Sequence, residues 1–404
     1  MRKSPMFACA LSVLALMTAC NQAQDRDYEC ITINHIVDEA DLTEIAFDFR
    51  VHALKSSDPL DGIGGIKCWD GVWLARTNDD RKMLRFDNYQ LTWVLDRLGR
   101  GPGEYFYISD FSYDKANNCI YIENDSSLVT YDATTMEFKG KQPVNINIQN
   151  ILNVEDKMVY FGYLLDDYKR DADGRIIKSP DESLVLVDRD ERNISKGKVL
   201  YTERSNERNL FGYPELFFVN SKNYSTCFPG VINRIVTFNE NGTTDVYRFK
   251  MGDGPVSKDL LELMEKEVDE NDIESLIAFY KELAAAIDRE SRISQVYNIM
   301  VDDKTVSFRA RYSNNGSLGS YSPYLYFVHN EKGTKVYKHL RVPGLLMDVD
   351  PTGANGNHQV AIIENLGDLI IDDNVPMSDL AEQIVAELRR QNDDNPVVLE
   401  FRFK

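Results

Sequence analysis

One short unit recurs six times along this chain, and it constrains the fold more than any other feature. In each copy an apolar strand leads into an Asp or Asn turn and then into a second apolar strand. The copies span residues 65–75, 111–122, 151–162, 216–228, 299–310 and 345–363. Their turn markers are Asp70, Asp114, Asp156, Asn220, Asp302 and Asp350. A unit of this size cannot bury its apolar face alone, so the copies must stack on one another.

The spacing of the copies indicates the type of repeat. Successive turn markers are 44, 42, 64, 82 and 48 residues apart. The two long steps contain polar or helical insertions at residues 166–181 and 257–292, and without them every step lies between 42 and 48 residues. Five copies continue into a second hairpin, at residues 82–99, 127–140, 183–199, 234–252 and 324–340. Modules of four strands, here A to D, at this spacing predict an all-β, six-bladed β-propeller.

The sixth module has strands A and B but no following hairpin. Two leftover segments alternate apolar and polar residues, Thr43–Leu54 and Val398–Lys404. A ring must pair its last edge strand or leave a site of aggregation. We therefore predict that the C-terminal segment is strand C of blade six and that Thr43–Leu54 is its strand D. The alternative is that both segments belong to a flanking sheet.

The N-terminus has the pattern of a targeting signal. Arg2 and Lys3 precede an apolar stretch, and Thr18 and Ala19 are small residues in front of Cys20. This pattern predicts a signal peptide over residues 1–19 and a polar tether over residues 20–42. The propeller is then expected to span residues 43–404. No later apolar run reaches the ~18 residues that a membrane span requires.

Two further patterns resemble known families. Residues 16–20, Leu-Met-Thr-Ala-Cys, resemble a bacterial lipobox, although Met17 stands where that motif prefers Leu. The resemblance implies a lipoprotein signal and lipidation of Cys20, whereas an ordinary secretory signal is the alternative. Gly65–Leu95 resembles an NHL-type blade, and Leu98–Tyr105 (LGRGPGEY) is similar to a loop of six-bladed β-propeller lipoproteins of Gram-negative envelopes. These likenesses imply a lipid-anchored propeller, with the outer membrane as the expected location, and no particular activity.

Two segments have helical rather than strand periodicity. Apolar residues recur at helical spacing through residues 257–292, which predicts an amphipathic helical hairpin with Asn271 or Asp272 as the second N-cap. A partner-binding or membrane-lying helix is the alternative, but its acidic face argues against an anionic membrane. Ser378–Arg390 predicts a C-terminal helix with Leu380, Ile384, Val385 and Leu388 on one face.

Charge and cysteine usage narrow the possible partners and chemistry. The formal net charge of −19 repels phosphate backbones and argues against a nucleic-acid partner. Cys30, Cys68, Cys119 and Cys227 lack metal-site spacing, and we interpret them as buried thiols, with a disulfide left open. Gly99–Gly103 lacks the context of a phosphate loop and is interpreted as turn geometry. No motif predicts a nucleophile, a metal site or a cofactor, so an enzymatic function has no support from a motif.

The candidate site follows from blade geometry. B–C loops and blade-to-blade D–A loops share one edge of a propeller, and the insertions at residues 166–181, 257–292, 312–321 and 365–395 all fall in these connections. Insertions on one edge are typical of the binding side of a repeat protein. The candidate ligand-binding residues at this edge are Arg76, Arg100, Glu104, Asn124, Asp125, Tyr163, Arg309, Arg311, Glu364 and Asn365. Tyr105 and Tyr107 are expected beside them.

This mixture of guanidinium, carboxylate and aromatic groups suits a polar small molecule, a glycan or an envelope protein. The leading hypothesis is therefore an envelope-anchored binding module that contacts the membrane only through Cys20. A hydrolase or lyase acting on a sugar-like substrate at the same edge is the alternative, and it rests on fold analogy. A structural scaffold without a ligand is a third reading.

Overall fold

The structure is a computed structural model, and the parts of the chain it describes cover most of the repeat. They are residues 35–60, 62–124, 127–154, 156–165, 169–170, 176–178, 182–191, 193–203, 218–219, 224–228, 233–238, 244–249, 259, 262–263, 266, 272–289, 293–302, 305–312, 324–364, 371–390 and 395–404.

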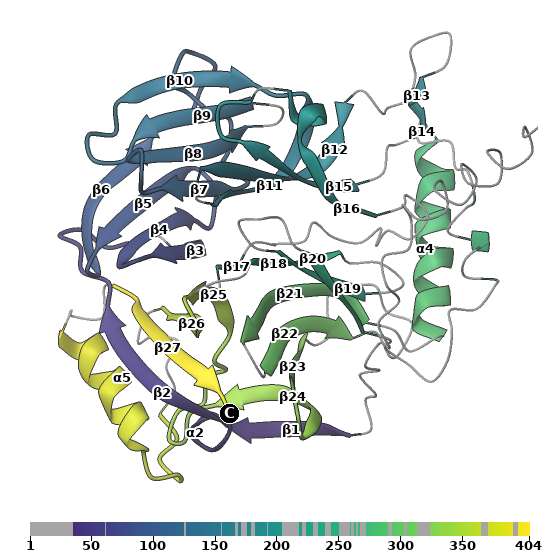
Figure 1. Ribbon diagram of the computed structural model, residues 1–404. Coiled ribbons are helices and arrows are strands. Elements are labelled where there is room, and N and C mark those ends of the chain that lie inside the picture. Colours follow the sequence, from purple (N-terminus) through teal and green to yellow (C-terminus); the bar gives the residue numbers. More distant parts are fainter. Residues whose placement is uncertain are drawn as a thin grey trace, which may run out of the picture.

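Six antiparallel modules stand around a central axis, with the first strand of each nearest the centre (Figure 1). Blade one is β3 (Ile63–Trp69), β4 (Val72–Thr77), β5 (Lys82–Asp87) and β6 (Gln90–Asp96). Blade two is β7 (Phe111–Asp114), β8 (Cys119–Asn124), β9 (Ser127–Asp132) and β10 (Phe138–Pro143). Blade three is β11 (Ile146–Val154), β12 (Lys157–Leu164), β15 (Glu182–Asp188) and β16 (Lys198–Glu203), with the 3₁₀ turn η2 (Ile194–Lys196) between the last two strands.

The remaining blades repeat this order. Blade four is β17 (Phe218–Val219), β18 (Tyr224–Phe228), β19 (Asn233–Phe238) and β20 (Thr244–Phe249). Blade five is β21 (Ile293–Asp302), β22 (Thr305–Tyr312), β23 (Tyr324–Asn330) and β24 (Gly333–Arg341). The predicted six-bladed propeller is confirmed.

Blade six joins the two ends of the chain. It consists of β25 (Pro351–Asn355), β26 (His358–Ile363), β27 (Val397–Phe403) and β2 (Ala46–Ala53), in that order from the centre outward. The C-terminal segment therefore supplies strand C and the N-terminal segment supplies strand D, as the alternation predicted. Ala53 pairs with Val397 and Ala46 pairs with Phe403, so the two strands are paired from end to end apart from one bulge.

A bulge in β2 interrupts the expected alternation. The register between β2 and β27 shifts between Phe47 and Arg50, and Asp48 has a positive φ of 53°. Phe47, expected on the buried side, is consequently 40% exposed. Asp48 Oδ2 lies 2.8 Å from His358 Nε2 on β26, and this hydrogen bond lowers the pKa of Asp48. The bulge therefore turns a carboxylate back onto strand B of the same blade.

Part of the expected tether is a strand. β1 (Ile36–Asp41) pairs in parallel with β24 from Ile36↔Val336 to Asp41↔Arg341, and it is the fifth, outermost strand of blade five. The expected start of the propeller at residue 43 is thus too late, because the paired chain begins at Ile36. A four-residue helix, α2 (Leu42–Ile45), capped by the Asp41 side chain, leads from β1 into β2. Residues 1–34, which include the predicted signal and Cys20, lie outside the described part of the chain.

The apolar side of β7 contacts blade one. The rings of Phe111 and Tyr113 lie edge-on to Trp69, with centroid distances of 6.5 and 6.1 Å. These rings belong to a buried cluster that joins blades one and two. The alternation FSYD in the sequence thus places every second side chain of this strand in the interface with the preceding blade.

The polar side of the same segment contacts blade three. Asp110 Oδ2 accepts from the Ile151 N–H at 2.9 Å, and Ser112 Oγ accepts from the Asn153 N–H at 2.8 Å. Lys67 of blade one forms an ion pair with the other oxygen of Asp110, which is 5% exposed. Buried polar groups near the axis therefore connect three successive blades, and each bond satisfies a group that would otherwise be costly to bury.

One backbone hydrogen bond recurs where the A–B and C–D turns meet. The residue after the Asp that ends strand C donates to the A–B turn: Asn88 to Gly71 at 3.2 Å, Ala133 to Asn118 at 2.8 Å and Arg189 to Asp156 at 3.1 Å. The repeated turn markers of the sequence thus correspond to a repeated bond within each of these three blades.

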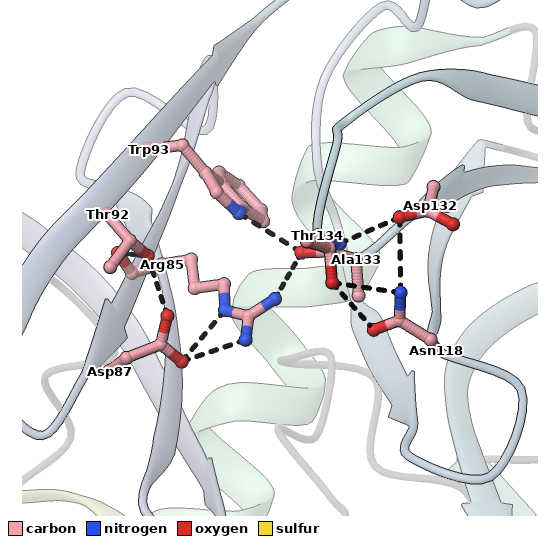
Figure 2. Close-up of polar contacts among 8 residues, drawn as sticks. All are labelled: Arg85, Asp87, Thr92, Trp93, Asn118, Asp132, Ala133 and Thr134. Carbon is pink, nitrogen blue, oxygen red and sulfur yellow. Dashed lines mark hydrogen bonds and ion pairs between the residues drawn. The ribbon is translucent and has the colours of Figure 1, made fainter.

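Figure 2 shows how these turns also join neighbouring blades. Arg85 on β5 and Trp93 on β6 both donate to the Ala133 carbonyl of blade two, and Arg85 also holds Asp87 at 2.8 Å. Asp132 accepts from the backbone N–H of Thr134, which closes the turn that presents this carbonyl.

Two longer helices lie at the periphery of the ring, on opposite sides in Figure 1. α5 (Asp379–Arg390) is N-capped by Ser378 and buries Leu380, Ile384, Val385 and Leu388, as predicted. α4 (Ile273–Arg289) begins after Asp272, whose side chain accepts from the N–H groups of residues 274 and 275. This matches the second helix of the expected hairpin, whereas most of the first lies outside the described residues.

Two of the four expected thiols are described, and both are free and buried: Cys68 and Cys119. Cys30 and the side chain of Cys227 lie outside the described part of the chain. In the described part of the chain, no helix combines the length and the apolar character needed to cross a membrane.

Candidate functional site

The inserted segments all begin and end at one edge of the ring. In an antiparallel blade the B–C and D–A connections leave the same edge, which we call the insertion edge. The short hairpin of β13 (Lys169–Arg170) and β14 (Ile176–Lys178) lies between β12 and β15, α4 lies between β20 and β21, and α5 lies between β26 and β27. α5, however, packs on the outer strands of blade six, so it belongs to the scaffold.

At this edge, side chains at the end of strand B in one blade bond to the start of strand A in the next blade or to the segment just before it. Arg76 at the end of β4 forms an ion pair with Asp80 and donates to the Ile108 carbonyl, just before β7, at 3.3 Å. Glu364 at the end of β26 accepts from the Ile63 N–H of β3 at 2.8 Å. Two predicted ligand-binding residues thus bond to the neighbouring blade.

Arg309 follows the same rule between blades five and six. Its guanidinium, on β22, forms an ion pair with Asp350 just before β25 and lies 4.2 Å from the centroid of the Tyr324 ring. The Tyr326 hydroxyl donates to the same carboxylate at 3.3 Å. Burial, together with the Asp350 charge, raises the pKa of Tyr326, so its hydroxyl remains a neutral donor.

The glycine-rich loop at residues 97–107 is held in a defined shape. Tyr105 donates its N–H to the Arg97 carbonyl at 3.1 Å and accepts from the Gly99 N–H at 3.0 Å. Glu104 Oε2 accepts from the Gly101 N–H at 2.6 Å. Gly99 and Gly103 have φ values of +156° and +73°, which side chains rarely adopt, so the prediction of turn geometry is confirmed.

Tyr105 does not belong to the binding surface, contrary to expectation. Its side chain is fully buried, and its hydroxyl shares its one proton between the Arg81 and Leu95 carbonyl oxygens, which lie 2.9 and 3.1 Å away. Burial raises its pKa to about 12. The residue is therefore the attachment that fixes the loop to blade one.

A hollow of about 560 Å³ opens beside this loop. It is lined by Asp96, Arg97, Leu98, Pro102, Gly103 and Glu104. In the same loop the Arg100 guanidinium lies 5.6 Å from the centroid of the Phe106 ring. Phe106 and Tyr107 are 48% and 43% exposed, which is unusual for side chains of this size.

The other predicted residues have separate locations. Asn124 is 4% exposed and accepts weakly from the Phe106 N–H at 3.4 Å. Tyr163 is on β12, opposite Asn147 of the same blade. Arg311 pairs with Tyr324 in the sheet, but its side chain lies outside the described part, as do Asp125 and Asn365.

Glu104 is thus the predicted residue that lines the hollow, and Arg100 lies in the same loop. Reasoning from the sequence missed Asp96 and Arg97. Asp96 and Arg97 directly follow the last apolar residue of strand D, and this position could have pointed to them.

Of the three carboxylates that an enzymatic reading would use, Glu104, Asp125 and Glu364, the first and last occupy different places, and Asp125 lies outside the described residues. Glu104 is bonded inside its own loop, and Glu364 is bonded to the start of β3. Among the residues that the structure describes, no three His, Cys, Asp or Glu side chains gather as a potential metal site.

The sequence profile of DUF5128, a family of six-bladed β-propellers, matches residues 21–282. The chain belongs to this family. No curated protein matches it. A protein from Bacteroides fragilis NCTC 9343, named as an inferred exported protein, has a similar structure. The TM-score is 0.59, and the identity is 15% over 93% of this chain and 100% of that one. A DUF4221 family member from Bacteroides vulgatus ATCC 8482 gives a TM-score of 0.40 and 11% identity over 89% of this DUF5128 chain and 98% of its own. The first likeness extends the propeller fold over nearly the whole chain.

Proposed function

We propose that this DUF5128 propeller is an exported binding module, anchored to the cell envelope by a lipid on Cys20, that holds a polar ligand at its insertion edge. The N-terminal pattern supports export and anchoring, because Arg2 and Lys3, an apolar stretch and small residues precede Cys20. The resemblance to NHL-like lipoproteins of Gram-negative envelopes agrees with it. The outer membrane is the proposed destination.

The observation that carries the binding role is the hollow beside the loop at residues 97–107. Several predicted side chains, such as Arg76 and Arg309, are used to join blades. The hollow instead presents Asp96 and Arg97 to solvent on a loop whose backbone is fixed by its own hydrogen bonds. A preformed site with exposed polar groups binds with little loss of conformational entropy.

The position of β1 is compatible with an anchor. β1 lies at the rim of the ring, outside blade five (Figure 1). A tether leading from Cys20 to Ile36 therefore joins the propeller away from blade one, where the hollow lies. An anchored molecule can in this way keep the hollow accessible.

The anchor is tested by metabolic labelling with an alkyne-tagged palmitate in cells that express the full chain. Label should appear in the membrane fraction and should be lost in Cys20→Ser. Cys68→Ser is the matched control, because Cys68 is a buried thiol, and it should keep the label. Label that persists in Cys20→Ser would contradict the anchor.

The binding edge is tested by photocrosslinking in the same cells. Benzoylphenylalanine at position 98, which lines the hollow and leaves Arg97 in place, should form adducts, whereas the same group at position 115 should not. Lys115 is a suitable control because it is exposed and lies in the A–B turn of blade two, at the opposite edge. Adducts at position 115 alone would show that the binding surface lies at the opposite edge, and would contradict the proposal.

A further inference from the structure

The hollow beside residues 97–107 is built from two blades, which makes it a rigid surface. The Tyr131 hydroxyl of β9 donates to the Gly103 carbonyl at 2.7 Å, while Tyr105 is bonded to the strands of blade one. A Cβ added at Gly103 would lie 2.7 Å from the Phe138 ring. The loop therefore packs so closely against blade two that a residue larger than glycine would clash there. The backbone that carries the lining residues is therefore held by both blades.

The charged groups that line the hollow are of both signs. Asp96 and Glu104 are acidic and Arg97 is basic, while Arg100 lies in the same loop outside the lining. An anionic ligand would meet two carboxylates, and a cationic ligand would meet the Arg97 guanidinium. Hydroxyl groups can use both, because each one donates to a carboxylate and accepts from a guanidinium.

Main-chain N–H groups of the loop already donate hydrogen bonds within the loop. The N–H groups of Gly99, Gly101 and Tyr105 all donate within the loop, and the Leu98–Tyr105 bridge closes it. An extended peptide that adds to a sheet depends on free main-chain groups of this kind. Recognition at this hollow must therefore come from side chains, which favours a ligand rich in hydroxyl groups over a peptide.

The same loop also carries an exposed aromatic side chain. Phe106 is 48% exposed, and Arg100 packs over its ring. An aromatic ring offers a flat apolar face, which suits the C–H face of a pyranose. The volume of about 560 Å³ lies within the range of roughly 300–1,000 Å³ that small-ligand sites occupy.

We infer that this hollow is a subsite for a neutral oligosaccharide, with Asp96 and Arg97 bonding its hydroxyl groups and Phe106 packing on a sugar ring. The inference deepens the proposed function and rests on it, because it names the ligand class for the same edge.

Calorimetric titration of the purified chain tests this assignment with defined probes. These are neutral gluco-, xylo- and manno-hexasaccharides, with hexagalacturonate as the anionic comparison and hexa-alanine as the peptide comparison. At least one neutral hexasaccharide should bind, and the two comparison probes should bind at least tenfold more weakly. Arg97→Ala and Phe106→Ala should each weaken that binding at least fivefold, and Asp96→Ala combined with Arg97→Ala at least tenfold.

Lys141→Ala, an exposed position on β10, is the control and should change the affinity less than twofold. Thermal melting of each variant verifies that it is folded. Unchanged affinity in the folded Asp96 and Arg97 variants would overturn the subsite, as would tighter binding of hexagalacturonate or hexa-alanine. If no neutral hexasaccharide binds while position 98 still crosslinks in cells, the sugar assignment is wrong and the binding edge stands. If that crosslink is also absent, both the sugar subsite and the proposed binding edge are wrong.

Discussion

At the scale of single residues, equivalent positions in the repeat have different physical roles. Asp70 and Asp114 are the turn markers of blades one and two, and each forms an ion pair with a basic residue. Asp70 pairs with Lys115 in solvent, where both side chains are more than two-thirds exposed. Asp114 is fully buried and accepts from Arg189 Nε of blade three at 2.8 Å. The same turn therefore recurs in both blades, whereas burial determines how much the ion pair at that turn contributes to the stability of the fold.

The substitution Asp114→Asn should destabilise the protein by about 3 kcal/mol, because it leaves the largely buried Arg189 guanidinium without its counter-charge. Chemical denaturation followed by tyrosine and tryptophan fluorescence measures this change. Asp70→Asn is the matched control, and it should leave the unfolding midpoint essentially unchanged because solvent screens an exposed pair. Equal midpoints for the two variants would contradict the role assigned to burial.

Cys68 provides a pH-dependent prediction. Burial raises the pKa of this thiol to about 12, whereas an unfolded cysteine has a pKa of about 8.5. The folded state thus favours the protonated form, and the stability from this group is complete below the unfolded pKa and is lost as pH rises towards 12. At pH 9, iodoacetamide should label Cys68 at least 100-fold more slowly in the native chain than in urea, as measured by peptide mass spectrometry. Comparable rates would show that the thiol is accessible.

At the scale of elements, the two helices show what periodicity can and cannot predict. The pattern of Ser378–Arg390 predicted both the helix and its buried face, because that face meets a single sheet, β2 with β27. In α4 the pattern predicted the helix, but Ile273 and Ile277 are 69% and 48% exposed. Periodicity identifies an apolar face, whereas the part of it that is covered depends on segments far away in the sequence.

The isoleucines of the two helices should therefore respond differently to the same substitution. Ile384→Ala in α5 should cost about 2–5 kcal/mol, because the fully buried side chain leaves a cavity against blade six. Ile277→Ala in α4 should change the stability little. Urea denaturation of both variants compares them directly, and a large effect at Ile277 would indicate that its face is covered.

The candidate site was predictable to a similar degree. The repeat alone placed Arg76, Arg309 and Glu364 at one edge, because strand order determines where strand B ends. It could not reveal that each of them bonds to the next blade, since these partners are set by the twist and spacing of neighbouring sheets. The same limit explains Tyr105, which the sequence places in an exposed loop and which the structure buries.

At the scale of the whole molecule, the ring is closed by pairing between the two ends of the chain. β27 lies between β26 and β2, and its Val397, Val398, Leu399, Glu400 and Phe401 are fully buried. The Tyr89 hydroxyl of blade one donates to Glu400 at 2.7 Å, so the same strand also bonds across to the next blade. A circular arrangement of this kind couples the termini to every blade between them, and we expect loss of β27 to weaken the whole ring.

Removal of residues 396–404 should therefore abolish the single cooperative unfolding transition, because β2 loses its only paired neighbour in the described sheet. A synthetic peptide of residues 396–404, added in excess, should restore the transition, and the midpoint should rise with peptide concentration because the peptide binds only the folded ring. The control is the same peptide with Asp at positions 399 and 401, which places charge on two buried positions and should have no effect. Circular dichroism melting measures all three samples. If the truncated chain melts at the same temperature as the full chain, closure by β27 does not support the ring, and blades one to five must be stable without it.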